Sequence, residues 1–109
     1  MAGDELDRAA AVLTRRLRRW GTASWAAPVG QPGTGGTRAD AVHRSVQQLA
    51  DLAAAAEDRP ARSVPRLDDR LLPDQLAVMV YDVGRAGDGA AVRAALAELT
   101  GLRRTLGFR

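Results

Sequence analysis

The sequence predicts an all-α fold, a compact bundle of about four helices that forms a single domain over residues 1–109. Three observations support this prediction. Four segments repeat apolar residues every three or four positions, which is the period of an amphipathic helix. Two connectors, at about 21–37 and 59–72, are rich in glycine or proline and separate these segments. The one strand-like run, at 76–81, has no second strand with which it could pair.

The first helix is predicted over residues 4–20. Acidic residues open this segment and arginines close it, which suits the helix dipole, and Gly21 is the predicted stop signal. The apolar positions recur at intervals of four, three, four and three, and they are Leu6, Ala10, Leu13, Leu17 and Trp20. These residues would form one stripe facing the core.

The connector at 21–37 holds five glycines and two prolines, so we expect it to form no regular structure. A single tryptophan in such a loop, Trp25, is expected to pack the loop onto the core. Residues 30–37 differ by one position from the phosphate-binding pattern G-x-x-x-x-G-K-[ST], because Gly36 stands where the pattern has lysine. Without that charge and without a preceding buried strand, we interpret this stretch as a linker and helix cap.

The second helix is predicted over residues 38–58. Thr37 and Asp40 have the spacing of a capping box at its start. Its stripe residues are Val42, Val46, Leu49, Ala53 and Ala56. The alanine run at 53–56 packs thinly and would let another helix approach closely.

Pro60 and Pro65 exclude helix from the second connector, where Val64 and Leu67 are expected to pack down on the core. The third helix is predicted over residues 73–86, with Pro73 at its favoured position near the start. One face of that helix carries Leu76, Met79, Val80 and Val83.

Val78 and Tyr81 fall on a different face of the third helix, which makes it apolar over much of its circumference. Such a helix is either central in its fold or faces a partner. After a turn at 87–89, in which Asp88 can cap the next helix, the fourth helix is predicted over residues 90–106.

All 16 cationic side chains are arginine, and lysine, isoleucine, asparagine and cysteine are absent. This usage is typical of a GC-rich bacterial genome, so the arginine content is only weak support for nucleic-acid binding. Without cysteine there are no disulfides and no thiolate metal ligands. The acidic N-terminal residues do not resemble a signal peptide, and no apolar run is long enough to span a membrane. We therefore expect a soluble, cytoplasmic protein.

The inventory of reactive side chains does not suggest an enzyme. His43 is the only histidine, and no nucleophile or second metal ligand accompanies it at a useful spacing. Adjacent acids such as Asp68 and Asp69 do not share a helix face and lie among polar residues. We expect no catalytic residues, no metal, no cofactor and no small-molecule substrate.

The function that the sequence favours is a non-catalytic accessory or adaptor protein that binds a partner protein or a second copy of itself. The contact residues expected for this function are Trp25, Val64, Pro65, Val78 and Tyr81. The alternative is a small nucleic-acid-binding regulator. Its phosphate contacts would come from the first helix, through Arg15, Arg16, Arg18 and Arg19. Helix C-termini attract arginine for dipole reasons alone, which makes this alternative the less favoured one.

Overall fold

Four long helices build the fold in this computed structural model, which describes residues 2–31 and 33–108. They are α1 (Ala2–Leu17), α3 (Arg38–Ala56), α4 (Leu72–Ala86) and α5 (Gly89–Thr105). A short helix α2 (Thr22–Ala26) and the 3₁₀ helix η1 (Asp69–Leu71) interrupt the connectors, and the described residues form no β-strand. The all-α prediction is confirmed, and the strand-like run at 76–81 is helical.

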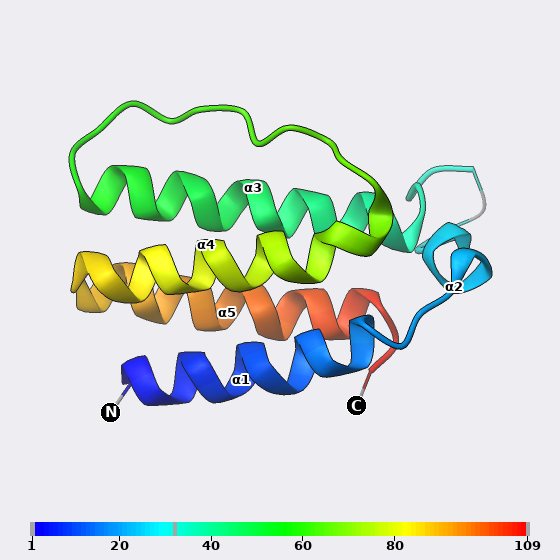
Figure 1. Ribbon diagram of the computed structural model, residues 1–109, viewed down its shortest axis with the longest axis horizontal. Coiled ribbons are helices and arrows are strands. Elements are labelled where there is room, and N and C mark those ends of the chain that lie inside the picture. The colour runs from blue at the N-terminus through cyan, green and yellow to red at the C-terminus, as the bar shows by residue number, and fades with distance from the viewer. Residues whose placement is uncertain (1, 32, 109) are drawn as a thin grey trace.

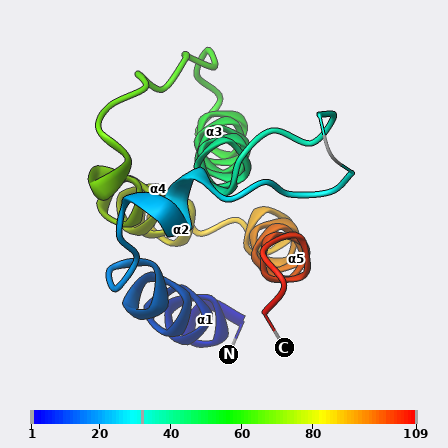
Figure 2. The same cartoon turned by 90° about the vertical axis from the view of Figure 1, so that its right-hand side faces the viewer.

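The long helices occupy the corners of a square when the bundle is viewed from its end (Figure 2). Around that square α3 lies beside α4, α4 beside α1, α1 beside α5, and α5 beside α3. Helices α1 and α5 run in one direction, and α3 and α4 run in the other (Figure 1). Because α3 and α4 are parallel, the chain between them must return along the length of the bundle.

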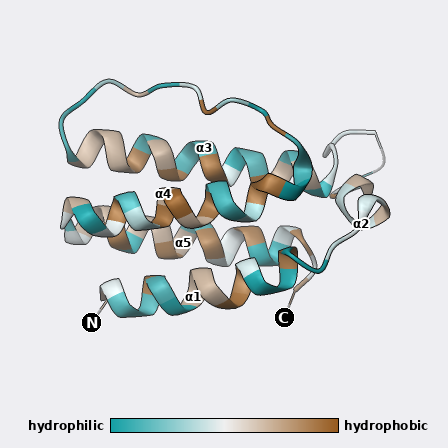
Figure 3. Cartoon of the chain, viewed as in Figure 1, coloured by the Kyte–Doolittle hydropathy of each residue, from teal (hydrophilic) through white to brown (hydrophobic). Residues whose placement is uncertain are grey.

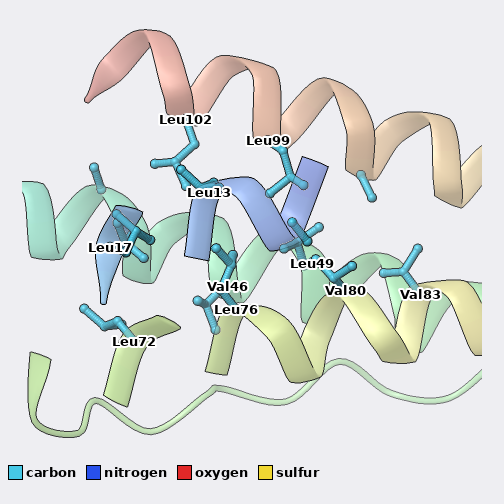
Figure 4. Packing of buried hydrophobic residues seen from close by; sticks show 14 of the residues in the cluster. Leu13, Leu17, Val46, Leu49, Leu72, Leu76, Val80, Val83, Leu99 and Leu102 are labelled. Carbon is cyan, nitrogen blue, oxygen red and sulfur yellow. The ribbon is translucent and has the colours of Figure 1, made fainter. Parts of the chain in front are cut away.

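The core is aliphatic, as the predicted stripes require. Leucine and valine side chains from all four long helices point toward one another inside the square (Figure 4). Those that are fully buried include Leu6, Leu13, Leu17, Val42, Val46, Leu49, Leu72, Leu76, Val83 and Leu99. Burial of each such side chain contributes about 1.5–3 kcal/mol to folding, which makes this cluster the main source of stability.

The predicted caps are formed. Thr37 Oγ1 accepts the backbone N–H of Asp40 at 3.1 Å, and Asp40 Oδ2 accepts the backbone N–H of Thr37 at 2.9 Å, which completes the capping box of α3. At the start of α5, Asp88 Oδ1 accepts the N–H of Ala90 at 2.9 Å. Gly87 ends α4 with a positive φ of 72°, a conformation that favours glycine.

Three local predictions were wrong. Helix α1 ends at Leu17 and Gly21 instead precedes α2 in an extended conformation, so it is no stop signal. The first connector does hold regular structure, because burial of Trp25 supports the single turn of α2. Leu67 stays exposed, whereas Val64 packs against the core as expected.

Candidate protein-contact surface

Helix α4 is apolar on two opposite sides. Leu76, Val80 and Val83 are buried in the core, while Val78 and Tyr81 are exposed with 53% and 66% of their surface accessible. Figure 3 shows the hydrophobic colouring continuing along much of this helix. The predicted second apolar face is therefore present. Since the core is already filled by the first set, the exposed pair contributes little to folding within one chain.

The exposed residues belong to a regular row that we call the α4 stripe, defined as Leu71, Asp74, Val78, Tyr81 and Arg85. Their spacings of three, four, three and four place them on one side of the helix. Leu71, at 43% exposure, extends the apolar part of the row to the beginning of α4. The sequence prediction did not include Leu71, although its spacing from Val78 is the signal that identifies it.

A shallow groove of about 260 Å³ runs beside the α4 stripe, between α1 and α4. Small side chains line its floor, among them Ala10, Ala11 and Ala77, and Tyr81 stands at its edge. Arg18 also lines the groove, and its Nη2 lies 3.0 Å from Asp74 Oδ1. Small residues of this kind allow another element to approach the helix backbones closely.

An extended segment, residues 59–68, returns along the outside of α3 to the start of α4, and we call it the strap (Figure 1). The Gln47 carboxamide holds its centre: Nε2 donates to the Arg62 carbonyl at 2.9 Å, and Oε1 accepts the Val64 N–H at 2.7 Å. Gln75 Nε2 donates to the Pro65 carbonyl at 3.1 Å. Side chains of α3 and α4 thus satisfy the strap backbone in place of a neighbouring strand.

Val64 and Pro65 face a pocket of about 210 Å³ that the strap forms with α3 and α4. Met79 and Asp82 bring α4 into the same pocket. The structure therefore brings four of the five predicted contact residues around one helix. Gln47 and Gln75, which position the strap, were not identified from the sequence because their partners lie 10 to 17 residues away.

Trp25 is placed apart from the other predicted contact residues. It is only 2% exposed and packs edge-to-face against Trp20, with ring centroids 4.8 Å apart. Trp20 in turn contacts Phe108 at 5.7 Å, which joins α2 to the end of α5. This position matches the expected role of pinning the loop, and it leaves Trp25 little accessible surface outside the pocket at the end of the bundle.

Two of the four arginines of the predicted cationic cluster contact different neighbours of α1. The Arg16 guanidinium stacks over the Phe108 ring at 3.6 Å, on the α5 side of α1. Arg18 pairs with Asp74 on the α4 side. Arg15 and Arg19 are exposed and make no contact of this kind within the described residues. Arg16 thus faces the end of α5 and Arg18 faces α4, while both side chains stay exposed.

His43 lies beside the α3 capping box, where its Nδ1 is buried and has no hydrogen-bond partner among the described residues. Burial lowers the pKa of His43 below 6.5, and the positive charge of Arg66 lowers it further against an opposing effect of Asp40. The pKa of Asp40 is lowered by the Thr37 backbone hydrogen bond and by Arg66, whose Nη2 lies 3.0 Å from Asp40 Oδ1.

The glycine-rich stretch at 30–37 forms a returning loop, with Pro32 outside the described residues. The N–H of Val29 donates to the Gly36 carbonyl at 3.0 Å, and Pro28 and Thr37 form an isolated bridge. The loop leads into the capping box, in which Asp40 Oδ2 accepts the N–H of Thr37. The predicted helix cap at the end of this stretch is confirmed.

A wider pocket of about 540 Å³ opens at the end of the bundle, between the tryptophans and residues 67–70. Its carboxylates are already paired: Arg70 Nε lies 3.1 Å from Asp68 Oδ1, and Arg66 Nη2 lies 3.7 Å from Asp69 Oδ1. Within the described ranges, no three histidine or carboxylate side chains come together as metal ligands. Among the described residues, no helix is both long enough and apolar enough to span a lipid bilayer.

Comparisons of the chain with protein-family models, with curated proteins and with solved structures found no match.

Proposed function

We propose that this chain is a non-catalytic interaction module whose contact surface is the exposed side of α4. The observation that supports this proposal most strongly is the α4 stripe, on which Leu71, Val78 and Tyr81 stay exposed although the core behind them is complete. Apolar side chains scattered singly over a surface need no explanation, but three in helical register on one face do.

The surroundings of the α4 stripe suit a binding surface. A groove of small residues lies on one side of it, and the strap with Val64 and Pro65 lies on the other. Tyrosine is among the residue types that anchor protein interfaces, because its ring buries a large area at a low entropic cost. Tyr81, the most exposed apolar residue of the α4 stripe, stands at the edge of this groove.

Site-specific cross-linking in the native host tests the proposal. A photoreactive amino acid replaces Val78 in one variant and Arg44, an exposed residue of α3, in the control. We expect protein adducts from position 78, and we expect Tyr81→Ala in the same chain to reduce them several-fold. Adduct formation at position 78 that is no stronger than at position 44 would overturn the proposal.

The nucleic-acid alternative has less support, because two of its four arginines are engaged by Phe108 and Asp74. If it were correct, duplex binding would weaken steeply with salt and would be lost when Arg15 and Arg19 are both replaced by alanine.

A further inference from the structure

We propose that the α4 stripe binds the α4 stripe of a second copy of this chain, with the two helices antiparallel. This inference rests on the proposed function, since it names the occupant of the same surface. It is carried by the order of chemical types along the row: an acid at 74, apolar residues at 78 and 81, and a base at 85.

This order is self-complementary when one helix is reversed. A two-fold axis midway between residues 79 and 80 places Val78 of each copy opposite Tyr81 of the other. The same axis places Asp74 opposite Arg85, because both pairs share one midpoint along the helix. The two charges of one chain are separated by 11 positions, about 16 Å of helix, so both ion pairs form together at the two ends of the contact. They add to the exposed pairs that Asp74 makes with Arg18 and Arg85 makes with Asp82 within each copy.

A parallel arrangement is disfavoured by the same residues. It would place Asp74 against Asp74 and Arg85 against Arg85, which brings like charges together at both ends. The three-and-four spacing of the α4 stripe is that of a coiled-coil seam, which has two apolar positions in each repeat. In an antiparallel pair, a residue at one of these positions packs against a residue at the other position of the partner helix. The sequence of the row therefore selects the orientation.

The size of the contact predicts a reversible dimer. Two exposed apolar side chains from each copy, Val78 and Tyr81, and two ion pairs form a smaller surface than the roughly 800 Å² per partner of a standard stable interface. We therefore expect a monomer–dimer equilibrium with a dissociation constant on the order of tens of micromolar.

Reversing the charges at positions 74 and 85 tests the pairing, with dimerisation of the purified full chain measured by sedimentation equilibrium. Asp74→Arg and Arg85→Asp should each weaken dimerisation at least tenfold, because each creates two like-charge contacts. The double variant should restore it. The two single variants, each monomeric alone, should form a heterodimer when they are mixed, since every contact then joins opposite charges.

The matched controls are Glu5→Arg, another acid in the first turn of a helix, and Arg104→Asp, another base in a last turn. Both should dimerise like the wild-type chain, and all variants should retain its circular dichroism spectrum. Absence of a heterodimer in the mixture, or unchanged dimerisation of both single variants, would overturn antiparallel pairing. A chain that is monomeric at millimolar concentration but still yields adducts to another protein from position 78 would refute self-pairing while leaving the proposed function intact.

Discussion

The side-chain carbonyl of Gln47 accepts the backbone N–H of Val64 at 2.7 Å, a contact that joins the middle of α3 to a segment 17 residues further along the chain. The same carboxamide donates to the Arg62 carbonyl. One side chain thus satisfies the backbone on both sides of Ser63, as a neighbouring β-strand would.

Replacing Gln47 with alanine should release the strap. Two backbone groups of the strap lose their partners, so we expect the free energy of unfolding to fall by about 1–2 kcal/mol in urea titrations. Hydrogen exchange of the Val64 backbone amide should also become faster in this variant. Gln48→Ala, one position along on the exposed side of α3, should change neither quantity, and equal effects of both variants would contradict the clamp.

Glutamate substituted at position 80 or at position 78 should distinguish the buried face of α4 from its exposed face. Val80 is 3% exposed, so Val80→Glu buries a charge and should cost more than about 4 kcal/mol, enough to unfold the chain. Val78→Glu should alter stability by no more than about 0.5 kcal/mol, because that side chain faces solvent. Thermal melts followed by circular dichroism measure both, and a large loss in Val78→Glu would place position 78 in the core.

Trp25 should behave as a core residue. Trp25→Ala removes a buried side chain and its contact with Trp20, so we expect a loss of about 3–5 kcal/mol in the free energy of unfolding. Guanidinium titration followed by far-UV circular dichroism measures this loss. A variant that keeps its stability but loses association would instead assign Trp25 to a partner surface.

Acid sensitivity should depend on the α3 capping box. The pKa of Asp40 is below its ordinary 3.8 in the folded chain, so its contribution is present above that pH and is lost as the pH falls through the lowered pKa. Asp40→Asn should cost about 1 kcal/mol near neutral pH and much less in acid. Urea titrations from neutral to acidic pH measure this difference, and a constant gap between the two proteins would contradict the assignment.

The single histidine allows its pKa to be measured by NMR without resonance overlap. We expect a pKa below 6.5 for His43, because burial and Arg66 both disfavour the imidazolium. The unfolded chain then binds more protons than the folded one, so stability should decline as the pH falls below 6.5. Arg66→Gln should raise this pKa and Arg62→Gln should not, whereas a wild-type pKa at or above 6.5 would contradict the burial of Nδ1.

The long helices and their caps could be predicted because their signals are local. The stripe from Leu6 to Leu17 and the pair Thr37 and Asp40 each lie within a few turns of one helix, so spacing alone identifies them. The second apolar face of α4, with Val78 and Tyr81, was visible in the same way.

The remaining features depend on contacts between distant residues. The contacts of Arg16 and Arg18 are made with Phe108 and Asp74, which lie far away in the sequence. The chemistry of tryptophan suits both a core and an interface, so Trp25 could not be assigned without its neighbours. Helix α2 is too short to form by local preference and depends on the burial of that same residue.

The two long helices of each half of the chain, α1 with α3 and α4 with α5, stand at diagonal corners, which has a consequence for assembly of the core. Helix α1 meets α4 and α5 but scarcely α3, its successor among the long helices, and α4 packs far more on α3 and α1 than on α5. Neither the N-terminal nor the C-terminal half of the chain can therefore cover its own leucines. Residues 1–58 and 69–109 should each remain largely unfolded as separate peptides, and the hydrophobic interior should arise only when the two halves interleave.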